Sequence, residues 1–545
     1  MVRRSVSRGI LASVAAGLIA VVLYAPAATA ASKAPAATAA TKQGCLKRPN
    51  NQYGKLRECV TLEGVRAHQA AFQAIADANG GNRAAGTSGY DASVDYVVKK
   101  LEGAGWDVEI HLFDFTVAQP VQQHTPVVAT HATGGVTGST LGTVNNQVTP
   151  IDIKLAPADR AGSTSGCQGA FTEAAVGAPL TAAPAGGPND FAGFVAGRIA
   201  LVQRGGCSFA LKVANAQTAG AAAVIFFNQG DTPARSVTLG GVTAVPPATS
   251  AFTTINIPLV GVSFAAGEQL SQAGTTATAA VANLPQENVI AELEGDNDNN
   301  VVMAGGHLDS VPAGPGINDN GSGSAALLET ALMLANIKPE NTLRFAWWGG
   351  EESGLVGSTA YVAGLSAAEL DRIAMYMNYD MVGSPNYIQM VYDANQSSFP
   401  APAGVPIPPG SEAIENFYER YYTGINEPYD DAQFSGRSDY QAFIANGIPS
   451  GGLFTGAEVP KTAEQQTIWG GTTGAQFDPC YHAACDTYLN FNPHALEVNS
   501  ELIAMAALTF AYSTESVNGV KGKAVPGKSK IKLPTPAGPR GTFVP

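Results

Sequence analysis

The sequence of 545 residues predicts an α/β fold: a mixed central sheet covered by helices on both faces, interrupted by an inserted, mostly β unit. Two observations predict it. From residue 286 onward, short apolar runs that suit buried strands alternate with helical patterns. Residues 118–285 carry few charges and are rich in Val, Thr, Ala, Gly and Pro, which indicates a separate domain.

The N-terminus has the composition of a secretory signal peptide, assigned to residues 1–30. Arginines lie among the first eight residues, and the apolar run that follows, 10–23, is short for a membrane span. Ala28-Thr29-Ala30 is a small-x-small cleavage site. The alternative, an uncleaved anchor, fits less well. No later run of about 20 apolar residues occurs, so we expect a secreted, extracellular protein without a stable membrane anchor.

The catalytic domain is expected in two pieces, residues 60–117 and 286–515, after a mature N-terminal segment at 31–59. The first piece has helical periodicity followed by an alternating strand pattern. The second contains the repeated strand–helix pattern. Its expected strands are 301–305, 342–348 and 374–378, and its expected helices are 324–334, 413–422 and 494–512.

The inserted unit and the tail differ from this pattern. Within 118–285, the β-runs 199–203 and 223–228 flank a helical stretch at 209–219. Residues 516–545 are basic and rich in Gly, Pro and Lys without periodicity, which predicts a disordered tail.

Charge excludes one class of partner. The formal net charge is −13, and the body of the chain is more acidic than this total because the tail is basic. Nucleic acid requires a basic surface, so we expect no nucleic-acid partner.

The six cysteines fall into three regional pairs. An even count in an exported protein predicts disulfides, and the alternative, zinc thiolate sites, lacks C-x-x-C spacing. No free thiol is therefore expected. The predicted pairs are Cys45 with Cys59, Cys167 with Cys207, and Cys480 with Cys485.

Polar side chains follow the apolar strands of the second piece. His307 and Asp380 end two of them, and the adjacent Glu351 and Glu352 follow a third. In α/β sheets, functional groups gather beyond the carboxyl ends of the strands. Each of these groups alone could be a solvated turn, but together they indicate a site.

Two loops supply further donors. Asp319 lies in a glycine-rich loop that opens a helix, where an Asx turn is the simpler explanation. His482 lies between Cys480 and Cys485, so a disulfide there would close a tight loop around it. Asp309 is placed to accept the second imidazole N–H of His307.

This set predicts metal-assisted hydrolysis. His307, Asp319, Asp380, His482 and one of the two glutamates, Glu351 or Glu352, suit zinc or another divalent first-row ion. If Asp319 is shared, two metals could activate a bridging water. The other glutamate would then be free to accept a proton.

Five stretches resemble the secreted bacterial di-zinc leucine aminopeptidases. The resemblance covers 60–115 and 286–515, and the stretch 197–229 resembles a protease-associated (PA) domain. The matching stretches are GGHLDSVPAGPGINDNGSGSAALLE (305–329), FAWWGGEESGLVGS (345–358), NYDMVG (378–383), FSGRSDYQAF (434–443) and DPCYHAACDT (478–487).

The resemblance implies a zinc-peptidase fold of the phosphorylase/hydrolase-like type and a role for each residue. His307, Asp319 and Asp380 would hold one zinc, and Asp319, Glu352 and His482 the other. Glu351 matches the general base and Tyr481 a residue that assists the tetrahedral intermediate. Arg437 matches an arginine near the active site and is assigned to substrate binding with Tyr481.

The expected activity is therefore that of a secreted, monomeric aminopeptidase with two Zn²⁺ per chain. It would release hydrophobic, leucine-type N-terminal residues from peptides or proteins with a free N-terminus. Two alternatives stay open: a carboxypeptidase or aminoacylase on the same scaffold, and a non-catalytic polypeptide-binding protein. The sequence leaves open the preferred residue, the role of the PA domain, terminal processing and any calcium modulator.

Overall fold

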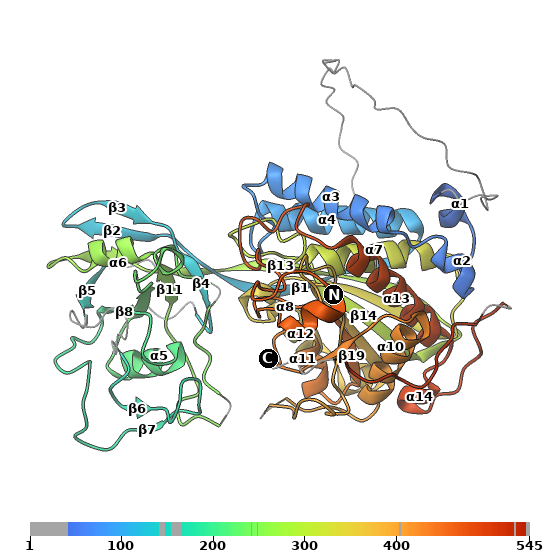
Figure 1. The fold of residues 1–545 in the computed structure, drawn as a ribbon. Helices are drawn as coiled ribbons and strands as arrows, with labels where there is room; N and C mark the ends of the chain where they lie inside the picture. The colour runs from blue at the N-terminus through green and yellow to red at the C-terminus, as the bar shows by residue number, and fades with distance from the viewer. Residues whose placement is uncertain are drawn as a thin grey trace, which may run out of the picture.

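The computed structural model shows two bodies joined side by side (Figure 1). The larger is an α/β body with helices above and below a central sheet, and the smaller is rich in strands. The expected signal peptide and the start of the mature segment lie outside the described residues. These are 42–140, 148–153, 166–240, 242–247, 249–402, 405–527 and 530–540.

The larger body is built on an eight-stranded sheet that mixes parallel and antiparallel pairs, as predicted. Its central strands are parallel, β13 pairs antiparallel with β1 and β15, and β17 pairs antiparallel with β19 and parallel with β18. In spatial order the strands are β1 (Asp107–Ala118), β13 (Val281–Leu293), β15 (Asn341–Trp348), β14 (Asn297–His307), β16 (Ile373–Tyr379), β19 (Ser450–Phe454), β17 (Met390–Tyr392) and β18 (Asp430–Ala432).

Both faces of this sheet are buried, which explains the continuous apolar runs of its strands. In β14, Val302 and Ala304 face one core, and Met303 faces the other. The first core is covered by α3 (Leu62–Ala78), α4 (Ser88–Ala104), α7 (Gly321–Leu334), α10 (Ser411–Ile425) and α13 (Pro493–Tyr512). The second is covered by α8 (Val356–Gly364), α11 (Tyr440–Ala445) and α12 (Ala463–Trp469).

The smaller body is inserted through a two-stranded ribbon. β1 and β13 pair antiparallel from Asp107↔Glu292 to Ala118↔Val281, so the chain leaves at Ala118 and returns at Val281. The expected insert, 118–285, therefore includes the first residues of β13. The insert has a nine-stranded sheet in the order β10-β4-β11-β9-β8-β5-β12-β2-β3.

The insert is mostly β, with two helices against its sheet, α5 (Phe209–Thr218) and α6 (Phe264–Leu270). Buried β8 and β9 form its centre. The strands of this sheet are β2 (Val121–Thr125), β3 (Ala129–His131), β4 (Gly134–Thr137), β5 (Thr149–Ile153), β8 (Ile199–Gln203), β9 (Ala223–Phe227), β10 (Val242–Thr243), β11 (Leu259–Val262) and β12 (Thr276–Thr278).

Disulfides join the predicted cysteine pairs: Cys45–Cys59, Cys167–Cys207 and Cys480–Cys485. The first ties α1 (Lys42–Lys47) to the chain that enters α3. Within the described ranges, no helix combines the length and apolar character needed to cross a membrane.

The described part of the tail differs from the expected disorder. After the short helix α14 (Glu515–Asn518), Ile531 and Leu533 pack against the first core. Arg420 of α10 donates to the carbonyl oxygens of Leu533 and Pro534. A few apolar residues without periodicity are enough to hold extended chain on a surface, and a compositional argument does not detect them.

Candidate metal centre

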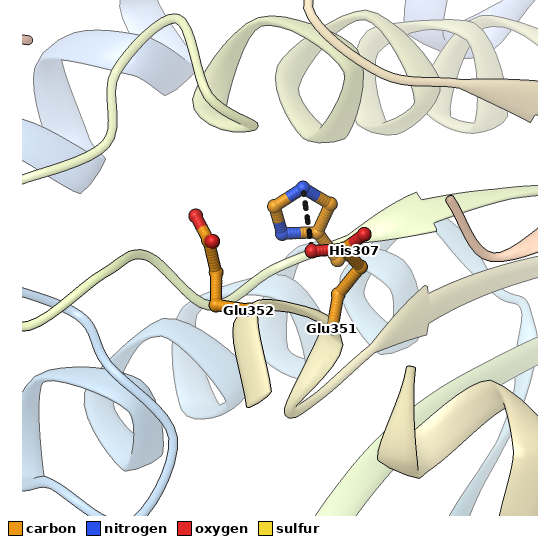
Figure 2. Close-up of side chains that lie close together, drawn as sticks. All are labelled: His307, Glu351 and Glu352. Atoms are coloured by element: carbon orange, nitrogen blue, oxygen red, sulfur yellow. Dashed lines mark ion pairs between the residues drawn. The ribbon is translucent and has the colours of Figure 1, made fainter. Parts of the chain in front are cut away.

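The sheet brings three chain segments to one edge. β15, β14 and β16 are parallel neighbours, so their carboxyl ends lie together. β14 ends at His307, Asp380 follows β16, and Glu351 and Glu352 begin the short helix η2 (Glu351–Ser353) after β15. Figure 2 shows both glutamate carboxyl groups reaching the level of the His307 ring, with Glu351 beside the ring and Glu352 to one side.

Asp319 lies between the two histidines. Its Oδ1 is 3.3 Å from His307 Nε2, and its Oδ2 is 3.3 Å from His482 Nε2. The loop before α7 holds it there, because the backbone N–H groups of Asn318 and Asp319 donate to the carboxylate of Asp486, at 2.8 and 3.0 Å. One carboxylate therefore faces two imidazoles with separate oxygens.

Two groups of donors share this aspartate. In one group, His307 Nε2 also lies 3.3 Å from Asp380 Oδ1. In the other, His482 Nε2 lies 2.9 Å from Glu352 Oε2. Within each group the donor atoms lie within 4.8 Å of one another. The groups are His307, Asp319 and Asp380, and Asp319, Glu352 and His482.

The donors fit bound cations. His307 Nε2, Asp380 Oδ1 and Glu352 Oε1 are buried atoms without a hydrogen-bond partner among the described residues. Buried polar atoms are normally satisfied, so these three atoms are available to coordinate cations. Imidazole nitrogens with carboxylate oxygens are the donor types that zinc takes.

The pKa shifts of these side chains also indicate a site for cations. Burial, followed by repulsion from Asp319, raises the pKa of Glu352 to about 7. Burial would lower the pKa of His307, but Asp380 and Glu351 raise it well above its usual value. A cation between these groups would remove the repulsion.

Glu351 lies outside the two groups that share Asp319 and forms another close group with His307 and Glu352. Its Oε2 is 3.9 Å from His307 Nε2. Burial raises its pKa well above the usual value, and the carboxylates of Asp380 and Glu352 raise it further. A carboxyl group that lies beside a metal site is placed to accept a proton and return it.

Asp309 differs from its expected contact. His307 Nδ1 lies 3.1 Å from the backbone carbonyl oxygen of Asp309 and 3.6 Å from its carboxylate, which is beyond hydrogen-bond distance. The carboxylate instead accepts from the backbone N–H of Glu351 at 3.2 Å. Asp309 thus orients the imidazole through its main chain and the Glu351 turn through its side chain.

Two further polar residues support the donors without having been singled out in the sequence. Ser438 donates its hydroxyl proton to Asp380 Oδ2 at 2.7 Å, and Asp486 fixes the Asp319 loop. Both lie within stretches that match the resembled family, FSGRSDYQAF and DPCYHAACDT. Their place in these two stretches is the signal in the sequence that could have pointed to them.

Tyr481 and Arg437 contact each other beside His482. The Tyr481 ring stacks on the His482 imidazole, with centroids 3.8 Å apart. Arg437 donates to Tyr481 Oη at 3.3 Å and to Glu458 at 2.8 Å. The phenol is therefore positioned beside the second donor group.

A cavity of about 650 Å³ opens over these groups. Most of its wall comes from the α/β body, and it includes Asp319, Glu351 and His482. The insert contributes Val242 and Thr243 of β10 and the nearby Val245 to the wall. Apolar or partly apolar side chains that line the cavity are Val242, Thr243, Val245, Leu355, Met381, Tyr392, Phe454, Val459 and Phe477.

Known protein families match both bodies. The family model of peptidase family M28 matches residues 288–507, and the PA domain model matches residues 154–270. The second match lies entirely within the insert.

Similar proteins extend over most of the chain. An aminopeptidase of Pseudomonas aeruginosa is 41% identical over 481 residues, which cover 85% of this chain and 83% of that protein. A probable lipoprotein aminopeptidase of Mycobacterium tuberculosis, LpqL, is 41% identical over 473 residues, covering 85% and 88%. The fold is also that of BSAP, a zinc aminopeptidase from Bacillus subtilis, with a TM-score of 0.60 at 22% identity, covering 87% and 97%.

Proposed function

This chain belongs to peptidase family M28, and we propose that it is an exported aminopeptidase that uses two zinc ions to release apolar N-terminal residues from peptides. As a metallopeptidase it acts on peptide substrates. The observation that supports two ions is the position of Asp319, with one oxygen toward each histidine.

Each donor group would hold one zinc. His307 and Asp380 would bind the first, Glu352 and His482 the second, and Asp319 both. Bound zinc lowers the pKa of a coordinated water and polarises a carbonyl group. Glu351 accepts the proton of the attacking water and delivers it to the leaving amine. Tyr481 donates a hydrogen bond to the oxyanion that develops on the scissile carbonyl.

The cavity favours removal of residues from the N-terminus. Within the described lining, Arg437 is the only Lys or Arg side chain, and Glu458 already pairs with it at 2.8 Å. A carboxypeptidase needs a free cation for the terminal carboxylate of its substrate. The apolar part of the cavity wall, in turn, suits a leucine-type side chain.

Glu351→Gln tests the proposed base. The amide cannot take a proton, so kcat should fall by about 10²–10⁴-fold while zinc content stays unchanged. Hydrolysis of leucyl p-nitroanilide and metal analysis of the same sample measure both quantities. Near-normal turnover by a zinc-loaded variant would exclude Glu351 as the base.

A substrate comparison tests the direction of cleavage. The enzyme should hydrolyse leucyl p-nitroanilide and leave N-acetylated peptides with a free carboxylate intact. The opposite preference would indicate a carboxypeptidase or an aminoacylase.

Removing metal with a chelator should abolish activity, and added zinc should restore it.

Three further properties are part of the proposal. Metal analysis should give about two zinc per chain, and size-exclusion chromatography should give a monomer. Disulfides are typical of oxidising compartments, which supports export. Expression in the native host should therefore place the mature chain in the medium.

A further inference from the structure

A second cluster of buried carboxylates lies away from the zinc site. Glu415 and Glu419 are four residues apart on α10 and therefore on one face of the helix. Asp431 lies on β18. Each offers one oxygen, and these oxygens lie within 4.8 Å of one another. The residues are 0%, 6% and 0% exposed, respectively.

The loop after β17 adds a fourth acidic group. Asp393 is 1% exposed and accepts from the backbone N–H groups of Ser397, Ser398 and Phe399, at 2.9, 3.0 and 2.7 Å. The two serine hydroxyls turn toward Asp431 Oδ2. The loop thus folds around the acidic cluster.

No positive side chain balances these charges. Among the described residues, no Lys, Arg or His lies within ion-pair distance of Asp393, Glu415, Glu419 or Asp431. Arg420, the next residue after Glu419, donates instead to the carbonyl oxygens of Leu533 and Pro534.

One oxygen of the cluster is also unsatisfied. Asp431 Oδ1 is buried and has no hydrogen-bond partner, although Oδ2 of the same carboxylate accepts from two hydroxyls. A fully buried carboxylate oxygen without a donor is unusual, because buried polar atoms are normally paired. This oxygen is therefore available to coordinate a bound cation.

We propose that Glu415, Glu419 and Asp431 bind a divalent cation of the calcium type. Every donor is an oxygen, whereas each group at the zinc centre includes an imidazole. Calcium takes six to eight oxygen ligands and prefers carboxylates, so waters or second carboxylate oxygens would complete its shell.

The alternative is a cluster neutralised by protons. Burial, followed by repulsion from Glu419, raises the pKa of Glu415 to about 9, and burial followed by repulsion from Asp431 raises that of Glu419 to about 7. A bound cation and bound protons both relieve this repulsion. Only the proposal of a bound cation predicts that added calcium binds to the protein and raises its Tm.

The position of the cluster suggests what the cation would stabilise. Asp393 follows Tyr392, and Asp431 precedes Ala432; both Tyr392 and Ala432 line the active-site cavity. Successive strand residues point to opposite faces, so the cation would lie behind the cavity wall. It would tie β18 to α10.

The test uses zinc-loaded enzyme freed of alkaline-earth ions by dialysis against resin-treated buffer. We expect CaCl₂ to bind with a stoichiometry of one per chain by isothermal titration calorimetry and to raise Tm by a few degrees. Glu419→Gln should weaken calcium binding at least tenfold. Glu412→Gln, an exposed residue of the same helix with the same change in charge, should bind calcium like the wild type.

A folding defect can be separated from loss of the site. Without calcium, Glu419→Gln should be at least as stable as the wild type, because one buried charge is removed. Its zinc content and circular dichroism should be unchanged. Absence of calcium binding by the wild type, or equal binding by Glu419→Gln, would overturn the proposal and leave the protonated cluster.

Discussion

Single hydrogen bonds orient the proposed zinc ligands. Ser438 contacts Asp380 Oδ2, Asp486 holds the backbone of Asp319, and the main chain of Asp309 orients His307. Such contacts fix a ligand before the metal arrives, which reduces the entropy that binding must overcome. They are therefore expected to affect zinc affinity more than the chemical step.

Ser438→Ala tests this expectation. Loss of the hydroxyl leaves Asp380 free to rotate, so zinc affinity should fall by about 10–100-fold. Competition with a chromophoric chelator measures the affinity, and excess zinc should restore most of kcat. Ser500→Ala serves as the control, because that buried hydroxyl donates only to the Leu496 carbonyl of its own helix. Equal zinc affinity in the two variants would contradict the role of Ser438.

The sequence predicts the donors better than it predicts their supports. His307, Glu352 and Asp380 could be selected because they follow apolar strands whose ends meet. Ser438 could not, because serine is common in loops and its partner Asp380 lies 58 residues away. For Asp309 the predicted partner, His307, is right and the predicted contact through the carboxylate is wrong, since side-chain direction in a turn depends on the local backbone.

Among the secondary elements, the loop that carries His482 holds the most exposed of the proposed zinc ligands. His482 has a positive φ of 53°, which L-residues seldom adopt, and its side chain is 42% exposed. The Cys480–Cys485 disulfide closes this loop on either side of Tyr481 and His482. The disulfide thus limits the conformations that this loop can adopt before His482 binds a metal ion.

Replacing Cys480 and Cys485 with serine should weaken the second donor group. We expect activity at limiting zinc to fall about tenfold and to recover with added zinc, because preorganisation is lost and the ligands remain. A zinc titration of leucyl p-nitroanilide hydrolysis measures this. The matched control replaces Cys45 and Cys59, whose disulfide lies away from the cavity. If both double variants showed the same zinc dependence, the loop would not need its disulfide.

The carboxylate cluster on α10 and β18 predicts a pH effect. The pKa of Glu415 is raised to about 9 and that of Glu419 to about 7, against an ordinary 4.5. At pH values between the ordinary pKa of 4.5 and the raised pKa values, the folded state binds more protons than the unfolded state. The free energy of unfolding therefore decreases as pH rises from about 5 to 9. Calcium should reduce this decrease, and its effect on Tm should be larger at pH 9 than at pH 6. An equal calcium shift at both values would contradict the assignment.

Element prediction succeeded where burial imposes a pattern. The strands β14, β15 and β16 are buried on both faces and read as apolar runs, and α3 shows helical periodicity. The tail has no period, and its contacts depend on a few residues that meet α10 and the first core. Such contacts arise only once the fold exists.

For the whole molecule, the main consequence of the topology is that the insert can be separated from the catalytic body. β1 and β13 form a continuous antiparallel ribbon whose last pair is Ala118↔Val281. The insert nevertheless contributes Val242, Thr243 and Val245 to the wall of the active-site cavity. The insert is thus not needed to complete the eight-stranded sheet, and it is positioned to restrict which substrates enter the cavity.

Replacing residues 119–280 with Asn-Gly should give a folded enzyme with altered selectivity. The two residues can close a hairpin between Ala118 and Val281, because these are directly paired. Zinc content and kcat for leucyl p-nitroanilide should change less than about fivefold, since the proposed ligands and base all lie outside the insert. The ratio of kcat/KM for a folded polypeptide with an accessible N-terminus to that for the anilide should rise. An unchanged ratio in a folded, zinc-loaded variant would mean that the insert does not restrict substrate size.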